Sequence, residues 1–308
     1  MANLTSHENQ IAFQELLCST AIGPRQKILI SSLSGPLAII AIFGNVLIIS
    51  ALQKVTTLYS SSKVLLGCLA CTDLGVGIII HPLRIGYTMS PVHSEWCFYL
   101  IRFYLTIGSV FCAISLFTLT AISIDRLLAI SLGLRYRHVV TWRKVWILVV
   151  TFWISNAFFA TLAFYSIRIY AGIVVILLGS CIVISTFCYS KIYVSLSKHQ
   201  KQVQEHIHQG QPNAKGVPLN IARYKRTVSS ALWVQVTLLV CYLPFGIVTI
   251  AYYITESLTP TLKIIIDVAV SLMLSNSSLN PFLYCWKIRE VKQAVKETIR
   301  QFCCFSSQ

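Results

Sequence analysis

The sequence predicts an all-α membrane protein, a bundle of seven transmembrane helices followed by a short amphipathic eighth helix. Of its 308 residues, 56% are hydrophobic and only 11% are charged, which is far too apolar for an ordinary soluble domain. Lipid offers the backbone no hydrogen-bond partners, so spanning segments are helices or closed barrels, and a helix needs about 20 apolar residues. Seven such runs are present, without the alternating pattern of barrel strands.

The seven predicted spans are separated by polar connections. They cover residues 28–51, 64–88, 98–130, 145–164, 169–196, 228–254 and 262–286. We therefore expect three parts in the chain, namely an amino-terminal segment 1–27, a seven-helix domain 28–286 and a tail 287–308. In the stretch 198–220, Gln, His, Gly and Pro with almost no aliphatic residues predict a flexible linker.

Lysine and arginine are distributed unevenly over the connections. Nineteen of the 25 lie in one set of alternating segments and six in the other. The positive-inside rule places the first set in the cytoplasm and the amino terminus outside, as in a multi-pass protein of the plasma membrane. We read no removable signal peptide. The net charge of +15 then describes a face beside anionic lipid and acidic partners, and it is weak evidence for nucleic acid binding.

One acid, Asp73, falls inside the second predicted span. A carboxylate in mid-membrane is costly, so it needs partners or an ion; a protonated Asp that is hydrogen-bonded to its neighbours is the alternative. Asn276 and Asn280 are four residues apart and share a helix face, with Ser277 adjacent. Their oxygens are ligands of the kind that a small hard cation prefers.

Three further features concern helix kinks and a charge pair. Pro244 and Pro281 each remove a backbone donor and kink the sixth and seventh spans, although membrane helices tolerate prolines generally. Arg126 follows Asp125 at the cytoplasmic end of the third span. There it can pair with the acid, or it can be an ordinary snorkelling arginine.

The tail has the pattern of a basic amphipathic helix on the inner leaflet. Residues 287–302 alternate apolar positions such as Val291 and Val295 with basic ones such as Lys292 and Lys296. Cysteines 303 and 304 follow directly, and we expect Cys303 and Cys304 to be palmitoylated, free reduced cysteines being the alternative.

The spans contain a series of short motifs in a fixed order. They are Gly44-Asn45, Leu69-Ala70-Cys71-Thr72-Asp73, Asp125-Arg126-Leu127, Trp153, Tyr189, Cys241-Tyr242-Leu243-Pro244 and Asn280-Pro281-Phe282-Leu283-Tyr284. Taken together, they resemble the pattern of the rhodopsin-like G-protein-coupled receptors along nearly the whole chain. This resemblance implies a receptor, not an enzyme, that transduces binding of an extracellular ligand into activation of a heterotrimeric G protein. Arrestin and a receptor kinase would be further partners.

The resemblance also implies roles for single residues. A sodium ion, with no other cofactor, would modulate the receptor from a pocket of Asp73, Ser115, Asn276, Ser277 and Asn280. The activation switch and G-protein contact would comprise Asp125, Arg126, Tyr189, Tyr242, Pro244, Pro281 and Tyr284. In this scheme the arginine releases its neighbouring acid and contacts the G protein, while the two tyrosines near the cytoplasmic ends support the active form.

The chain departs from the usual pattern in ways that bear on its ligand. Leu127 and Tyr242 replace a usual aromatic and a usual tryptophan, and the connection 165–170 is short and lacks cysteine. These features resemble the melanocortin, cannabinoid, lysophospholipid and adenosine receptor branch. Gly108 stands where amine receptors carry an aspartate, and Leu274 where opsins carry the retinal lysine, so neither ligand is expected.

The remaining candidates for ligand contact lie in the outer halves of the spans. They are mostly aromatic or small, with one acid, and they suit a peptide, a lipid or a nucleoside, although such aromatic residues also serve packing. They are Tyr104, Phe111, Cys112, Tyr242, Phe245, Thr249, Asp267 and Ser271.

The predicted outer face carries two further candidate sites. On this topology Cys18 and Cys97 are the only two of eleven cysteines outside the membrane in the oxidising compartment, so we expect a disulfide between them. Asn3 begins an acceptor for N-glycosylation. A transporter or channel would show internal repeats and broken helices, and a membrane enzyme a cluster of reactive groups; neither pattern is visible.

Overall fold

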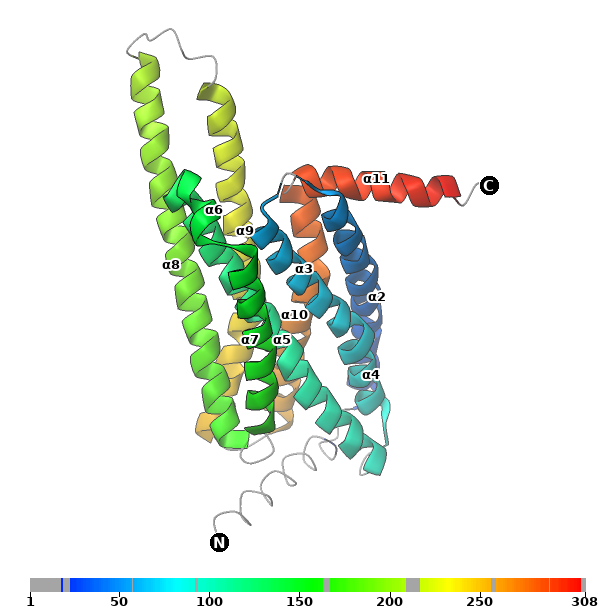
Figure 1. Ribbon diagram of the computed structural model, residues 1–308. Coiled ribbons are helices and arrows are strands. Elements are labelled where there is room, and N and C mark those ends of the chain that lie inside the picture. Colours follow the sequence, from blue (N-terminus) through cyan, green and yellow to red (C-terminus); the bar gives the residue numbers. More distant parts are fainter. Residues whose placement is uncertain are drawn as a thin grey trace.

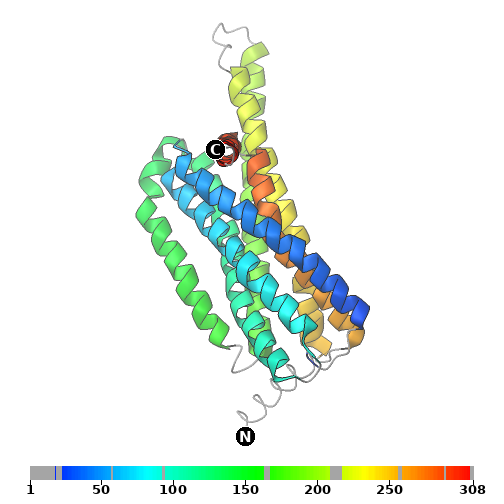
Figure 2. The same cartoon turned by 90° about the vertical axis from the view of Figure 1, so that its right-hand side faces the viewer.

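The computed structural model describes residue 18 and residues 23–56, 58–91, 94–162, 167–208, 217–255, 259–287 and 289–305. Within these ranges the chain is helical and contains no strand, which confirms the predicted fold class. Seven helical segments are long and apolar enough to cross a membrane. They lie side by side as a bundle, and the helix after them turns away across its end (Figures 1 and 2).

The spanning helices occupy nearly the predicted positions. The first is α2 (Pro24–Lys54), and the second is continuous from α3 (Ser60–Gly75) through the π turn η1 (Val76–Ile80) to α4 (His81–Met89). The others are α5 (Glu95–Leu132), α7 (Trp142–Leu162), α8 (Ile167–His208), α9 (Val217–Thr255) and α10 (Pro260–Lys287). Between α5 and α7 lie the short elements η2 (Gly133–Arg135) and α6 (Tyr136–Val139).

The π turn η1 has a local cause in the sequence. Pro82 stands in the first turn of α4 and has no N–H to donate to Ile78 O in the preceding turn. The backbone N–H of His81 donates instead to Val76 O, one residue further back than in an α-helix. An extra residue in one turn rotates the helix that follows it. The buried faces of α4, which carry His81 and Arg84, are set by this rotation.

Apolar side chains cover the outside of the bundle, while polar ones occur inside it. Large aliphatic and aromatic residues are exposed on the outward faces of the spanning helices, as on α7 at Ile147, Ile154 and Phe158. Asn45 and Asp73, by contrast, are completely buried. This distribution is expected where lipid, instead of water, surrounds the helices.

Glycine permits the close approach of α2 to Pro281 of α10. A Cβ atom placed on Gly44 would lie 2.7 Å from Pro281 Cγ, closer than real Cβ contacts come. Two hydrogen bonds support the same contact: Asn45 Nδ2 donates to Ser277 O over 3.1 Å, and Ser278 Oγ donates to Leu37 O over 2.8 Å. The first helix is therefore fastened directly to the turns around Pro281.

The helix after the bundle, α11 (Arg289–Phe305), is at the predicted position and runs across the bundle end (Figure 1). Its apolar side packs against the bundle through the buried residues Val291, Ala294 and Val295. Lys54 Nζ at the end of α2 donates to Thr298 Oγ1 (3.0 Å) and to Gln301 Oε1 (2.7 Å). We call this the α11 end of the bundle and the opposite end the disulfide end.

The prediction of a flexible linker over 198–220 is wrong for most of its length. Helix α8 continues to His208 and α9 begins at Val217, so that both extend beyond the bundle at the α11 end (Figure 1). The composition explains this, because the sequence from Lys198 to His208 holds Gln, Lys and Glu, which favour helix, and neither Gly nor Pro. Residues 209–216 lie outside the described part.

Candidate functional site

A network of hydrogen bonds surrounds Asp73 in the middle of the bundle. The residue is 0% exposed, and its two carboxylate oxygens accept from Asn280 Nδ2 (2.7 Å) and Ser115 Oγ (3.3 Å). The hydroxyl of Thr72 lies 2.8 Å from that of Ser115. Helices α3, α5 and α10 thus meet at one carboxylate, as the sequence suggested for this set.

The rest of the predicted sodium set lies beside this network. Ser277 interacts with the Asp73 carboxylate, and Asn276, Ser277 and Asn280 are all buried. Among the described residues, the buried Nδ2 of Asn276 and Oδ1 of Asn45 have no hydrogen-bond partner. The region therefore contains a buried donor and a buried acceptor that form no hydrogen bond, which is rare in protein interiors.

Asp125 is held by residues outside its own helix. Ser62 Oγ of α3 donates to Asp125 Oδ2 over 2.8 Å, and the hydroxyl of Tyr136 in α6 donates to Asp125 Oδ1. The Tyr136 hydroxyl also lies 2.9 Å from Ser61 Oγ. We call this set, Ser61, Ser62, Asp125 and Tyr136, the Asp125 clasp. Its carboxylate is 4% exposed.

The ion pair that the sequence allowed between Asp125 and Arg126 is absent. Both residues are described, and no nitrogen of Arg126 lies within 4.0 Å of the Asp125 carboxylate. The physical reason is the clasp, which takes both carboxylate oxygens. Sequence reasoning missed Ser62 and Tyr136 because neither lies in a motif that stands out in the chain.

The two tyrosines of the predicted switch are both buried near the α11 end. Tyr189 packs with Ile192, Leu127 and Ile130. The hydroxyl of Tyr284, three residues after Pro281, is buried and has no hydrogen-bond partner among the described residues. A buried hydroxyl without a partner is unfavourable, so Tyr284 gains a bond in any arrangement that brings an acceptor or donor within reach.

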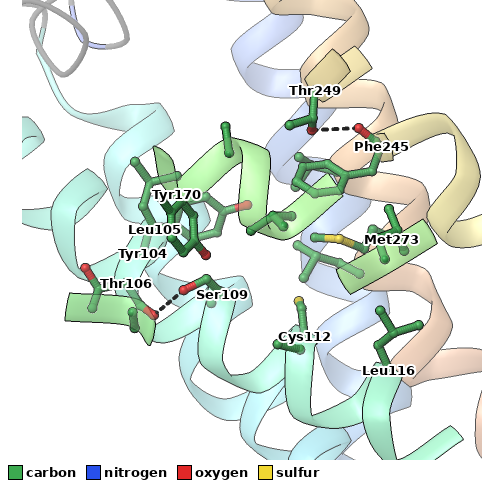
Figure 3. Close-up of a pocket in the computed structure, with 18 of the residues that line it drawn as sticks. Tyr104, Leu105, Thr106, Ser109, Cys112, Leu116, Tyr170, Phe245, Thr249 and Met273 are labelled. Carbon is green, nitrogen blue, oxygen red and sulfur yellow. Dashed lines mark hydrogen bonds between the residues drawn. The ribbon is translucent and has the colours of Figure 1, made fainter. Parts of the chain in front are cut away.

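A cavity of about 290 Å³ lies closer to the disulfide end and is lined mainly by α5, α8, α9 and α10, with further residues from η1, α4 and α7. Figure 3 shows Tyr104 and Tyr170 on one side of it and Phe245 and Met273 on the other, with Cys112 and Leu116 along α5. Six predicted ligand residues line it: Tyr104, Cys112, Tyr242, Phe245, Thr249 and Asp267.

Two predicted ligand residues do not line the cavity. Phe111 turns to the other side of α5, where its ring meets Trp153 edge to face at 5.8 Å and fills the space left by Gly75. Ser271 is not among the lining residues, and its hydroxyl is already hydrogen-bonded. Its hydroxyl accepts from Arg84 Nη2 and donates to Asp267 O.

Sequence analysis also missed two buried basic residues. Arg84 and Lys263 were counted only as outside charges, yet each is 1% exposed. Arg84 Nη2 donates to Asp267 O (2.8 Å) and Ser271 Oγ (2.7 Å), and Lys263 Nζ lies 3.5 Å from Asp267 Oδ2. The four-residue spacing of Lys263 and Asp267 on one helix face is the signal that could have indicated the pairing of Lys263; no such signal marks Arg84.

A disulfide joins Cys18 to Cys97 near the start of α5, with the two Cα atoms 6.1 Å apart. This end of the bundle is opposite to α11 (Figure 1). Asn3 lies outside the described residues. Cys303 and Cys304 fall in the last turn of α11, and their side chains lie outside the described part.

Seven spanning helices that enclose a mid-membrane carboxylate and a cavity between the helices are the architecture of a membrane receptor. A family model described as 7 transmembrane receptor (rhodopsin family) matches residues 44–171 and 164–284. The chain belongs to this family, and it is a G-protein-coupled receptor that signals through G proteins, not an enzyme.

Curated relatives cover nearly the same length. The chain is 26% identical to trace amine-associated receptor 9 of Homo sapiens over 310 residues, which is 92% of this chain and 87% of that protein. It is 23% identical to adenosine receptor A3 of Ovis aries over 280 residues, which is 82% of this chain and 84% of that one. Trace amine-associated receptor 5 of Homo sapiens is 26% identical over 85% and 82%. The branch within the family stays a prediction.

Proposed function

We propose that an extracellular ligand acts in the cavity and that the G protein is engaged at the α11 end. One observation carries the proposal: Tyr242 lines the cavity and stands two residues before Pro244 in α9. Its hydroxyl makes a long hydrogen bond, 3.5 Å, to Cys112 O on α5. A ligand that contacts Tyr242 therefore touches α9 close to Pro244, which removes a backbone hydrogen bond and makes the direction of the helix easier to change there.

The response at the other end rests on Arg126. With Asp125 engaged in the clasp, the guanidinium is free to contact an inserted segment of the G protein instead of its neighbouring acid. A ligand shifts the receptor toward this arrangement only if it binds that state more tightly. The agonist site and Arg126 thus act on one equilibrium from opposite ends of the bundle.

The orientation follows the distribution of basic residues, with the disulfide end outside the cell and α11 inside. The basic side of α11 then faces anionic lipid headgroups at the plasma membrane, and palmitoylation at Cys303 and Cys304 adds a second anchor. Asn3 carries a glycan on the outer face. Arrestin and a receptor kinase act at the same inner surface as the G protein.

The surroundings of Asp73 suit a sodium ion. Besides the carboxylate, the hydroxyls of Thr72, Ser115 and Ser277 and the unpaired amide oxygen of Asn45 offer the oxygen donors that a small hard cation takes. Bound there, the ion would balance the negative charge of the buried carboxylate and would replace the Asn280 amide as its partner. A cation that prefers the resting arrangement would oppose activation.

The test combines a ligand screen with a variant in which a side chain fills the cavity. Membranes that contain the receptor are screened with amines, nucleosides, peptides and lysophospholipids for GTPγS uptake by several purified G proteins. Gly108→Phe places a ring in the cavity, while Gly179→Phe places one on the exposed side of α8, where nothing lies within 4 Å. We expect the agonist response to be lost in the first variant and kept in the second. An unchanged response in Gly108→Phe at equal surface expression overturns the proposed site.

A further inference from the structure

Among the described residues, two basic side chains and one acidic side chain gather at one end of the cavity. Lys263 and Asp267 line the cavity there. Arg84 lies directly behind Asp267. We call Arg84, Lys263 and Asp267, with Ser271 and Tyr87, the basic cluster.

The single carboxylate of this cluster is already engaged. Asp267 Oδ2 lies 3.5 Å from Lys263 Nζ and has no hydrogen bond from any described residue. The ammonium group also lies over the Tyr87 ring, 5.9 Å from its centroid. This loose pair neutralises Lys263 but leaves nothing for a second buried cation.

That second cation is the Arg84 guanidinium. Its Nη2 donates only to neutral acceptors, Asp267 O and Ser271 Oγ, and its Nε is buried without a partner among the described residues. A buried charge without a counter-charge is strongly unfavourable. The neighbouring His81 is completely buried and adds no negative charge. Within the described residues, the cluster therefore carries one uncompensated positive charge.

The remainder of the cavity is mostly apolar. Leucine, isoleucine, valine and aromatic side chains line most of it, Val270 among them. Figure 3 shows Leu116, Phe245 and Met273 in this part. A ligand that fills this part gains by burying apolar groups, provided that its polar end reaches the basic cluster.

We propose that the receptor's ligand is an amphipathic anion, with a carboxylate or phosphate head at Lys263, close to the buried Arg84 guanidinium, and an apolar tail toward Phe245 and Met273. The proposal rests on the cavity being the agonist site. An anionic head supplies the missing negative charge and lets Lys263 exchange its loose contact with Asp267 for a close one. An amine would bring a third cation to the same place and would compete with Lys263 for Asp267, which sets this chain apart from what the names of its trace amine-associated relatives suggest.

Binding is tested without any G protein. The purified full chain in nanodiscs is heated with decanoate, decyl phosphate, decylamine or 1-decanol, each below its micelle concentration, and the unfolding midpoint is followed. The four probes share one tail and differ in the head, so the comparison isolates its charge. We expect decanoate, decyl phosphate or both to stabilise the receptor, and the comparison between them separates a carboxylate from a phosphate ligand. Stabilisation by decylamine or 1-decanol as large as that by the anions overturns the proposal.

Variants locate the head group. Lys263→Gln should weaken binding of the stabilising anion by about ten- to hundredfold, the effect of losing a hydrogen bond between charged groups. Lys263→Arg should retain it. Arg25→Gln removes the same charge from an exposed position in the first turn of α2, and it should change the affinity less than about twofold, because exposed charges contribute little. Equal effects of Lys263→Gln and Arg25→Gln would place the anion elsewhere.

If Lys263→Gln does not fold, the ranking of the four probes on the unaltered chain still decides the matter. The experiments also distinguish a failure of this ligand class from a failure of the proposed function. Anion binding without GTPγS uptake would uphold this ligand class and refute the cavity as an agonist site. GTPγS uptake driven by an amine would support the cavity as an agonist site and refute the anionic ligand class.

Discussion

Replacing Tyr136 by Phe removes one of the two hydrogen bonds that hold the Asp125 carboxylate in the clasp, while the ring remains. Both oxygens are engaged in the structure, and Arg126 is unpaired. Without the tyrosine hydroxyl, a nearly buried carboxylate needs a new partner, and the guanidinium next to it is the nearest one in sequence. The substitution should therefore favour the paired state of Arg126 and reduce signalling.

The size of the effect follows from the kind of bond. A hydrogen bond to a charged group contributes about 1.5–3 kcal/mol. Asp125 is 4% exposed, so water replaces the lost bond poorly. Since about 1.4 kcal/mol corresponds to a factor of ten, the ratio of released to paired Arg126 should fall by about ten- to hundredfold. Where the released state is a minority, ligand-independent signalling falls in the same proportion.

The assay is basal GTPγS uptake in membranes with matched surface expression. Tyr59→Phe is the control, because the Tyr59 ring packs against that of Tyr136 at a tilt, with 4.9 Å between the centroids, but Tyr59 makes no hydrogen bond to Asp125. The effect of Tyr136→Phe should also vanish in an Asp125→Asn background, where the ionic partner of Arg126 is gone. Basal uptake equal to or above that of the unaltered receptor would refute the reasoning and show that the clasp holds the resting state.

Three further predictions concern other parts of the bundle. Asp73→Asn should abolish the sodium dependence of agonist affinity, and a dependence that persists in the variant excludes this pocket. Tyr224, whose side chain lies outside the described part, stands in α9 between Arg223 and Lys225; Tyr224→Glu introduces an acid that can pair with Arg126, so it should lower basal GTPγS uptake, and an undiminished rate would mean that another contact restrains the receptor. Gly75→Ala places a Cβ 2.2 Å from Phe111 Cε1 and should destabilise the receptor by about 1–3 kcal/mol, lowering its melting temperature, whereas Gly67→Ala, with nothing within 4 Å, should not.

The spanning helices and the residues around Asp73 were accessible from the sequence because both depend on local features. Apolar length defines a span, and a four-residue spacing places Asn276 and Asn280 on one face. Side chains whose direction depends on a neighbouring helix were not accessible. Phe111 turns away from the cavity because Gly75, far off in sequence, leaves room for its ring.

The basic cluster shows a second limit of sequence reasoning. Arg84 falls near the end of a predicted span, where a basic residue ordinarily reaches water. Its burial depends on the π turn at Val76–Ile80 and on acceptors from α10. Neither of these can be predicted from a run of apolar residues. The linker was misjudged for the opposite reason, since polar composition there was given more weight than helix propensity.

The fastening of α2 to α10 makes these helices, with α11, a single mechanical unit. Hydrogen bonds from Asn45 and Ser278 span the contact beside Pro281, and Lys54 extends it to α11. Any movement of α10 around Pro281 must then carry the first helix and the amphipathic helix with it. Paired spin labels on the exposed faces of α2 and α11 would keep a constant separation on activation. Labels on α2 and α9 would report the movement, which makes α2 the natural reference frame for spectroscopy on this receptor.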